Sequence, residues 1–293
     1  MTPTQNLADT VTPLRQSRTL RRVGIYALLM GVYSLLAVAK EHTRYADYGD
    51  LPAQIHAALT LVLGWLLVFR TNAAYARWWE ARTLWGSLVN SSRNLSFKLF
   101  DLARLPADSR HRLLQLIVAF PKSLRDHLRR LPPEPGVGAL VPNCELQAHI
   151  PVALASEVYA ELGQLRRGAT LEAIELRLID IEARNMLDIC GGCERILNTR
   201  LVRSYRTFAR QCVALYLLTF PWGIVEGFGW WTVPLTIITS YFMLGLETVA
   251  EHIEEPFGFD EDDLNLDAIC EGIEKSVKQI AAGAVQNEED APT

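Results

Sequence analysis

Four stretches of the chain contain apolar and small polar residues but no aspartate, glutamate, lysine or arginine. They are 17, 19, 15 and 20 residues long and cover residues 23–39, 51–69, 211–225 and 227–246. A helix that crosses a bilayer needs about 17–25 mostly apolar residues, so the first, second and fourth stretches are long enough and the third is marginal. The pattern predicts four transmembrane helices in two hairpins. The alternative is that the stretches form buried core helices of a soluble protein.

Basic residues border these stretches unevenly. The ends that carry arginines are those before residue 23, after residue 69 and before residue 211: Arg15, Arg18, Arg21, Arg22, Arg70, Arg77, Arg82, Arg200, Arg203, Arg206 and Arg210. The opposite ends carry only Lys40 and Arg44. Because cytoplasmic loops are enriched in lysine and arginine, we expect both termini and residues 70–210 in the cytoplasm. A cleaved signal peptide is disfavoured, since the leader and the first apolar run are both longer than usual.

Between residues 70 and 210 the apolar positions recur every three or four residues, as in Leu113, Leu116, Ile117 and Phe120. This spacing predicts amphipathic helices, and the prolines and glycines of residues 131–138 predict a loop between two helical groups. The expected fold class is all-α. Its expected parts are an N-terminal cytoplasmic segment (1–22), a first transmembrane hairpin (23–69), a cytoplasmic helical region (70–210), a second hairpin (211–250) and a cytoplasmic C-terminal segment with a disordered tail (251–293).

Composition excludes several classes of protein. The 293 residues are 49% hydrophobic and 21% charged, with a mean hydropathy of +0.10, which fits neither a disordered chain nor a uniformly apolar transporter. The net charge of −4 gives no support for a nucleic-acid partner. Five scattered cysteines do not resemble a secreted disulfide framework and favour a reducing compartment.

Cys190 and Cys193 have the C-x-x-C spacing found in redox and zinc sites. No second C-x-x-C pair or H-x-x-x-H motif completes a zinc set, and the surrounding pattern is helical instead of the strand-to-helix turn of a thiol oxidoreductase. The sequence also lacks a G-x-S-x-G motif and a P-loop. We therefore expect no catalytic site, no enzymatic activity and no required cofactor.

Three motifs follow one another along the chain. The first, at residues 69–86, has the pattern F-R-x-N-x-x-Y-x-R-W-x-E-A-R followed by L-W-G. The second is G-C-E-R-I at residues 192–196, and the third is E-H-I-E-E-P-F-G at residues 251–258, followed by four acidic residues. With the apolar stretches, these motifs resemble the bestrophin family in its bacterial form, over about residues 8–275.

The resemblance implies a homopentameric ion channel of the bacterial inner membrane, with one central pore that passes chloride and other small anions. Bacterial members also pass monovalent cations such as sodium or potassium, which is the alternative. Position matching places the pore neck at Leu61, Trp65 and Phe69, which share one helical stripe because they are four residues apart. Trp65 departs from the phenylalanine or isoleucine more usual in the family. A second, cytoplasmic constriction is expected at Ile174.

Eukaryotic bestrophins bind calcium at the stretch that matches the third motif, and position matching assigns Glu255, Asp260 and Asp263 as ligands. Carboxylates suit a hard cation such as Ca²⁺. His252 is a poor calcium ligand, however, and Glu255 replaces the usual asparagine. Bacterial members are not expected to need calcium, and acidic residues near a helix N-terminus are favourable without an ion.

Two other classes of function stay open. One is a membrane-anchored enzyme that uses the Cys190 and Cys193 pair or the carboxylates near Asp260. The other is a membrane-bound scaffold whose cytoplasmic helices bind a soluble partner.

Overall fold

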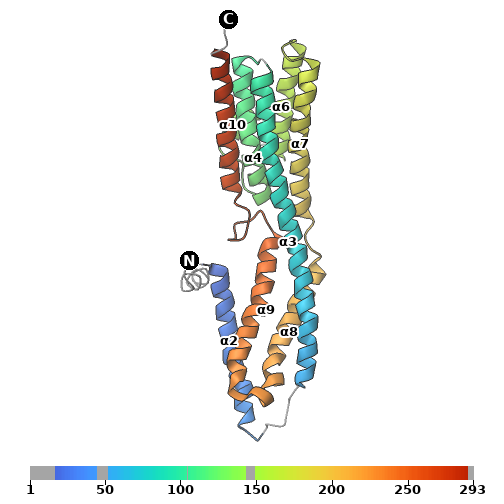
Figure 1. Ribbon diagram of the computed structural model, residues 1–293, viewed down its shortest axis with the longest axis vertical. Helices are drawn as coiled ribbons and strands as arrows, with labels where there is room; N and C mark the ends of the chain where they lie inside the picture. The colour runs from blue at the N-terminus through green and yellow to red at the C-terminus, as the bar shows by residue number, and fades with distance from the viewer. Residues whose placement is uncertain (1–16, 45–51, 104, 143–148, 290–293) are drawn as a thin grey trace. The chain divides into compact units, whose positions relative to one another are not determined.

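The computed structural model describes residues 17–44, 52–103, 105–142 and 149–289 (Figure 1). Within these ranges the regular structure is helical and contains no strand, so the expected all-α fold class is confirmed. The tail is expected to be disordered from Asn287 onward, but residues 287–289 form the last turn of a helix; the rest of the tail lies outside the described residues.

The chain divides into two compact units. The first holds the described residues up to Trp78, together with Arg200–Glu255 and Asp260–Asp262. The second holds Trp79–Thr199, Pro256–Phe259 and the described residues from Asp263 onward. Helix α3 (Ala53–Phe97) is continuous and contributes residues to both units.

The first unit contains α2 (Arg18–Glu41), the start of α3, α8 (Arg203–Phe228) and α9 (Thr232–Glu254). Three stretches of the described chain are long and apolar enough to cross a membrane: Thr19–Glu41, Gln54–Leu102 and Arg203–Glu254. The third stretch holds both α8 and α9, the two helices that the sequence predicts as separate spans.

A short 3-10 helix, η3 (Gly229–Trp231), joins α8 to α9, which lie side by side (Figure 1). Gly229 ends α8 with φ at +49° and ψ at −124°. A residue with a Cβ is strained in this conformation, so the sharp connection depends on a glycine.

Close packing inside the first unit depends on small and polar side chains. A Cβ added to Gly31 of α2 would lie only 2.4 Å from Cγ1 of Ile237 of α9. On α9, Thr236 and Ser240 are fully buried. Small residues of this kind let helix backbones approach closely where lipid supplies no hydrophobic driving force between helices.

Helices α3 and α8 share an apolar cluster made of Leu63, Leu67, Val213, Tyr216 and Leu217. Hydrogen bonds reinforce this contact, because Thr60 Oγ1 lies 2.6 Å from the Tyr216 hydroxyl. The cluster fixes which face of α3 is buried, and therefore which face is left exposed.

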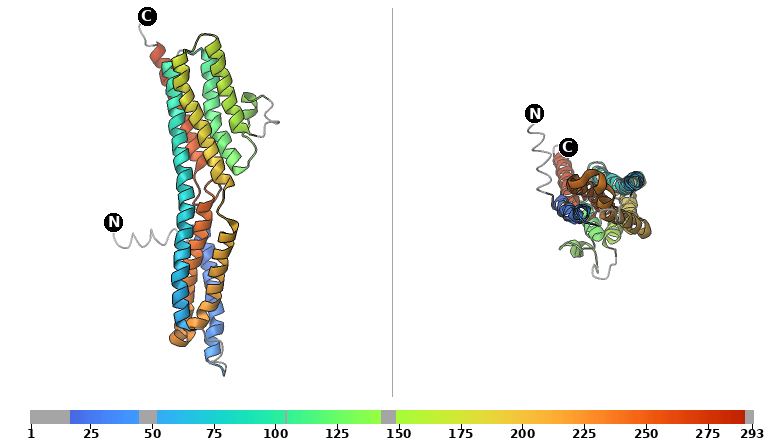
Figure 2. Two further views of the ribbon diagram at one scale, coloured as in Figure 1. Left: turned by 90° about the vertical axis from the view of Figure 1, so that its right-hand side faces the viewer. Right: turned by 90° about the horizontal axis from the view of Figure 1, so that it is seen from below.

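The second unit contains the remainder of α3, a π-helical turn η1 (Lys98–Leu102), α4 (Ala107–Arg129), the short α5 (Val137–Leu140), α6 (Ile150–Arg167), α7 (Ala173–Asn198) and α10 (Leu266–Glu289). The long helices run side by side (Figure 2). The predicted apolar face of α4 is confirmed, since Leu113, Leu116, Ile117 and Phe120 are all buried. The loop predicted at residues 131–138 is shorter in the structure: it ends at Gly136, and residues 137 and 138 belong to the start of α5.

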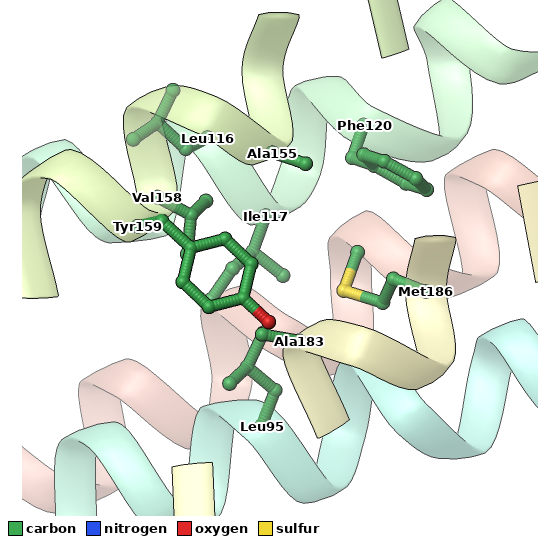
Figure 3. A pocket seen from close by; sticks show the side chains of 9 residues that line it. All are labelled: Leu95, Leu116, Ile117, Phe120, Ala155, Val158, Tyr159, Ala183 and Met186. Atoms are coloured by element: carbon green, nitrogen blue, oxygen red, sulfur yellow. The ribbon is translucent and has the colours of Figure 1, made fainter. Parts of the chain in front are cut away.

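A small apolar cavity lies among α3, α4, α6 and α7, with Tyr159 and Met186 in its wall (Figure 3). About 10 Å³ of it is open to a water-sized sphere. The Tyr159 hydroxyl donates to Asp180 Oδ1 at 3.0 Å. The cavity holds about one water molecule at most, so it is a packing gap and too small for a ligand.

Candidate functional site on helix α3

Within the first unit, helix α3 has one buried side. Its buried residues are separated by three, four or seven positions and are at most 4% exposed: His56, Leu63, Leu67, Arg70 and Ala74. Successive residues of a helix are about 100° apart, so these five occupy one side. That side packs against α8 through the apolar cluster.

Leu61, Trp65 and Phe69 occupy the opposite side of α3. Their exposed fractions are 67%, 63% and 60%. The rings of Trp65 and Phe69 meet edge to face, with centroids 6.1 Å apart. The structure thus places the three side chains in one exposed apolar stripe, and their role as a pore neck stays a prediction.

The expected cytoplasmic constriction residue lies near the start of α7. Ile174 is 66% exposed and Leu178, one turn later, is 42% exposed, whereas Ile179 is buried. Ile174 and Leu178 share a helix face because they are four residues apart. The constriction itself stays a prediction.

The residues expected to bind calcium follow α9. Glu255 caps the end of α9 and pairs with Arg200, with Nη1 and Oε1 2.8 Å apart. Asp260 is exposed and Asp263 is half-buried. The Glu255 carboxylate already has a cationic partner, and calcium binding by these three residues stays a prediction.

The sequence reasoning missed a buried ion pair in the first unit. Arg70 Nη1 on α3 donates to Glu247 Oε1 on α9, and the two side chains are only 1% and 9% exposed. Arg210 Nε on α8 donates to the same oxygen at 3.1 Å, and Arg210 Nη2 pairs with Glu251. One carboxylate therefore joins three helices. The sequence did hold one indication of this pair, because Glu247 is the residue directly after the last apolar stretch.

Glu254 continues this acidic face of α9 and is fully buried. Its backbone carbonyl accepts a hydrogen bond from Arg77 Nε at 3.3 Å, and Arg206 Nη1 lies 4.0 Å from its Oε1. Arginines of α3 and α8 thus meet carboxylates of α9 at three positions along the helix. Such buried charges are tolerated only when paired, so the set is sensitive to the loss of one partner.

The C-x-x-C cysteines lie on α7 and are 2% and 0% exposed. Burial raises the pKa of Cys190 to about 12 and raises the pKa of Cys193 as well. Both are therefore protonated thiols near neutral pH, which is the unreactive form. Their environment is that of structural core residues and argues against redox chemistry.

A second group missed by sequence reasoning lies in the second unit. Among the described residues, His127, His149 and Glu194 form a set whose ligand atoms all lie within 4.8 Å of one another. The histidines are 67 and 45 residues from Glu194 in the sequence, so the three residues form no short motif that could have predicted the set.

Known proteins share both the sequence and the fold of this chain. The sequence profile of the family described as Bacterial/Fungal Bestrophin protein matches residues 2–279. The voltage-dependent anion channel-forming protein of Nostoc sp. is 33% identical over 232 residues, covering 76% of each chain. The protein of that name from Synechocystis sp. is 34% identical over 244 residues, covering 79% of this chain and 78% of the relative.

A similar structure is a variant of a bacterial bestrophin homologue from Klebsiella pneumoniae. It is 28% identical, has a TM-score of 0.83, and the match covers 88% of this chain and 98% of the other. The family match over nearly the whole length agrees with the long apolar helices of the first unit. The chain is a membrane protein and belongs to the bestrophin family.

Proposed function

We propose that this protein is a bestrophin-type anion channel that assembles as a homopentamer in the bacterial inner membrane. The exposed stripe of Leu61, Trp65 and Phe69 carries the proposal, because it lies on the side of α3 farthest from the helix's own packing partner. In a ring of five chains each residue of the stripe supplies five side chains to a narrow neck. The names of the relatives, anion channel-forming proteins, support the choice of anions.

An apolar neck acts through the free energy of dehydration. Rings of leucine, tryptophan and phenylalanine offer an ion no ligand, so the neck gates by dewetting and favours weakly hydrated ions such as chloride. Dehydration alone does not select the sign of the charge. A channel for sodium or potassium is therefore the alternative that the experiment must distinguish.

We assign four crossings per chain, one each to α2, α3, α8 and α9. The joint between α8 and α9 presents Phe228, Trp230 and Trp231, which are 54%, 65% and 72% exposed and suit a membrane interface. Arginines gather at the other ends of these helices, and the enrichment of basic residues on the cytoplasmic side supports an orientation with both termini and the second unit in the cytoplasm. The remaining exposed apolar side chains of the four helices then face lipid or a neighbouring chain of the pentamer.

In this assembly Ile174 forms the cytoplasmic constriction, and conduction needs neither a cofactor nor enzymatic chemistry. The alternative of calcium at Glu255, Asp260 and Asp263 predicts currents that depend on added Ca²⁺. Recording with calcium and then with a chelator separates the two proposals.

The test is electrical recording from the purified full-length protein in planar bilayers. Combined replacement Trp65→Ala and Phe69→Ala widens the neck, so we expect the single-channel conductance to rise several-fold. Leu215→Ala is the matched control, because Leu215 lies on α8 and is 66% exposed, as much as Leu61. The control should conduct like the parent.

Reversal potentials under a potassium chloride gradient decide the selectivity. A reversal potential near the chloride equilibrium potential supports the anion channel. A reversal potential near the potassium equilibrium potential contradicts it and supports the cation channel instead. Absence of current from both the parent and the double variant contradicts any channel. Particle images without fivefold symmetry contradict the pentamer.

A further inference from the structure

Two histidines and one glutamate converge within the second unit. His127 lies near the end of α4, His149 is the residue that caps the start of α6, and Glu194 lies on α7. His127 Nε2 is 2.7 Å from Glu194 Oε1, and His149 Nε2 contacts the same oxygen. The two imidazole ring centroids are 4.4 Å apart. Three elements therefore direct polar atoms at a single point.

This point is open to small solutes. The side chains of His127, His149 and Glu194 are 28%, 31% and 27% exposed, so each is partly enclosed by its surroundings and still partly accessible to solvent. One carboxylate oxygen serves two imidazoles that lie almost in contact. A dication inserted among the three atoms would satisfy all of them at once.

We propose that His127, His149 and Glu194 bind a zinc ion. Two imidazole nitrogens and one carboxylate oxygen are a ligand set that zinc accepts, with water in the fourth position. Imidazole favours zinc over calcium and magnesium, which take oxygen ligands. The proposal concerns the second unit and does not depend on the channel.

The distances are close to those of a bound state. Zinc bonds of about 2.0–2.1 Å in a tetrahedron place the ligand atoms about 3.3 Å apart. The three ligand atoms lie within 4.8 Å of one another, and the His127 to Glu194 contact is 2.7 Å. Binding therefore requires the Glu194 oxygen to move away from both imidazole nitrogens, by about 0.6 Å in the case of His127, a movement that rotation of the glutamate side chain provides.

Binding also moves a proton. His149 Nδ1 accepts a hydrogen bond from the Val152 backbone N–H at 3.3 Å, so the imidazole proton lies on Nε2 and is donated to Glu194. When Nε2 binds zinc, the neutral imidazole carries its proton on Nδ1 instead, so Nδ1 no longer accepts from Val152 and the cap bond is lost. Zinc affinity should therefore fall in acid, because metal binding competes with protons for the imidazoles.

Zinc at this place would connect the end of α4, the start of α6 and the C-terminal part of α7. A ligand that binds only the folded state raises its stability by mass action. Cys190 lies one turn before Glu194 on α7, but the ligand atoms that gather at this point, among the described residues, are those of His127, His149 and Glu194. The set therefore has nitrogen and oxygen ligands only.

The experiment uses the full-length protein in detergent, stripped with a chelator and then desalted. Zinc chloride is titrated by calorimetry, and retained zinc is measured by elemental analysis after a second desalting step. We expect one zinc ion per chain, with affinity at least tenfold lower in His127→Ala, His149→Ala and Glu194→Gln. His111→Ala is the matched control, because His111 lies exposed on the same helix α4, and it should bind like the parent.

Two further readouts keep the test decisive if an alanine variant does not fold. Cobalt bound to the parent should give the strong visible absorption of a four-coordinate site, and zinc should displace it. Zinc should also raise the thermal unfolding temperature of the parent but not of Glu194→Gln, which keeps the shape of the side chain. The proposal is overturned if the desalted parent retains no zinc, or if the Glu194 variant retains as much as the parent.

Discussion

The Glu247 carboxylate binds the Arg70 guanidinium in an ion pair whose side chains are only 9% and 1% exposed. Arg70 directly follows Phe69, at the end of the apolar stretch on α3, and Glu247 directly follows Leu246, at the end of the stretch on α9. The first charged residue after each stretch is thus neutralised by the other. This pairing joins the stripe-bearing helix to α9 immediately beside Phe69.

Replacing Glu247 by glutamine should destabilise the protein by about 3–5 kcal/mol, because it leaves the Arg70 charge buried without its partner. Replacing both residues by methionine should be less damaging than the single change, since no buried charge then remains at the pair. Unfolding of the detergent-solubilised variants measures both effects, and the single Arg70→Met and Glu247→Met variants complete a double-mutant cycle with the double methionine variant.

The control for this cycle is the pair between Arg195 and Glu80, whose side chains are 64% and 43% exposed. An exposed pair contributes about 0–1 kcal/mol, so Glu80→Gln should be nearly neutral. If Glu247→Gln were equally mild, the buried pair would not hold the helices as described.

Features that depend on local spacing could be predicted from the sequence. The apolar stretches identify α2, α3, α8 and α9, and the four-residue spacing of Leu61, Trp65 and Phe69 is enough to place them on one stripe. Helix periodicity relates residues within one element, so it needs no knowledge of how elements pack.

Features that depend on packing between helices could not be predicted. Arg70 and Glu247 are 177 residues apart, and His127 meets Glu194 across 67 residues. The cysteines show the reverse case, because the C-x-x-C spacing indicates reactive chemistry while burial on α7 makes both thiols inert. Environment, not spacing, decides the chemistry of such groups.

Cys190 and Cys193 should resist alkylation in the folded protein. With the Cys190 pKa raised to about 12, only about one thiol in 10,000 is ionised at pH 8, and that fraction rises tenfold with each pH unit. Mass spectrometry after treatment with iodoacetamide at pH 8 should find both residues unmodified, and both modified once the chain is denatured. Rapid modification of the folded protein would revive the redox enzyme hypothesis.

Gly223→Ala should disturb the contact between α3 and α8. A Cβ at this position would lie 2.2 Å from Nδ1 and 2.4 Å from Cε1 of His56, whose ring is held by Thr219 at 3.2 Å and is 3% exposed. Either the imidazole or α8 must move, so we expect a loss of about 1–3 kcal/mol from overpacking. Gly227→Ala is the matched control, because no atom lies within 4 Å of its added Cβ. Removing the ring with His56→Ala should make Gly223→Ala nearly neutral, and equal unfolding temperatures for the two single glycine variants would disprove the close contact.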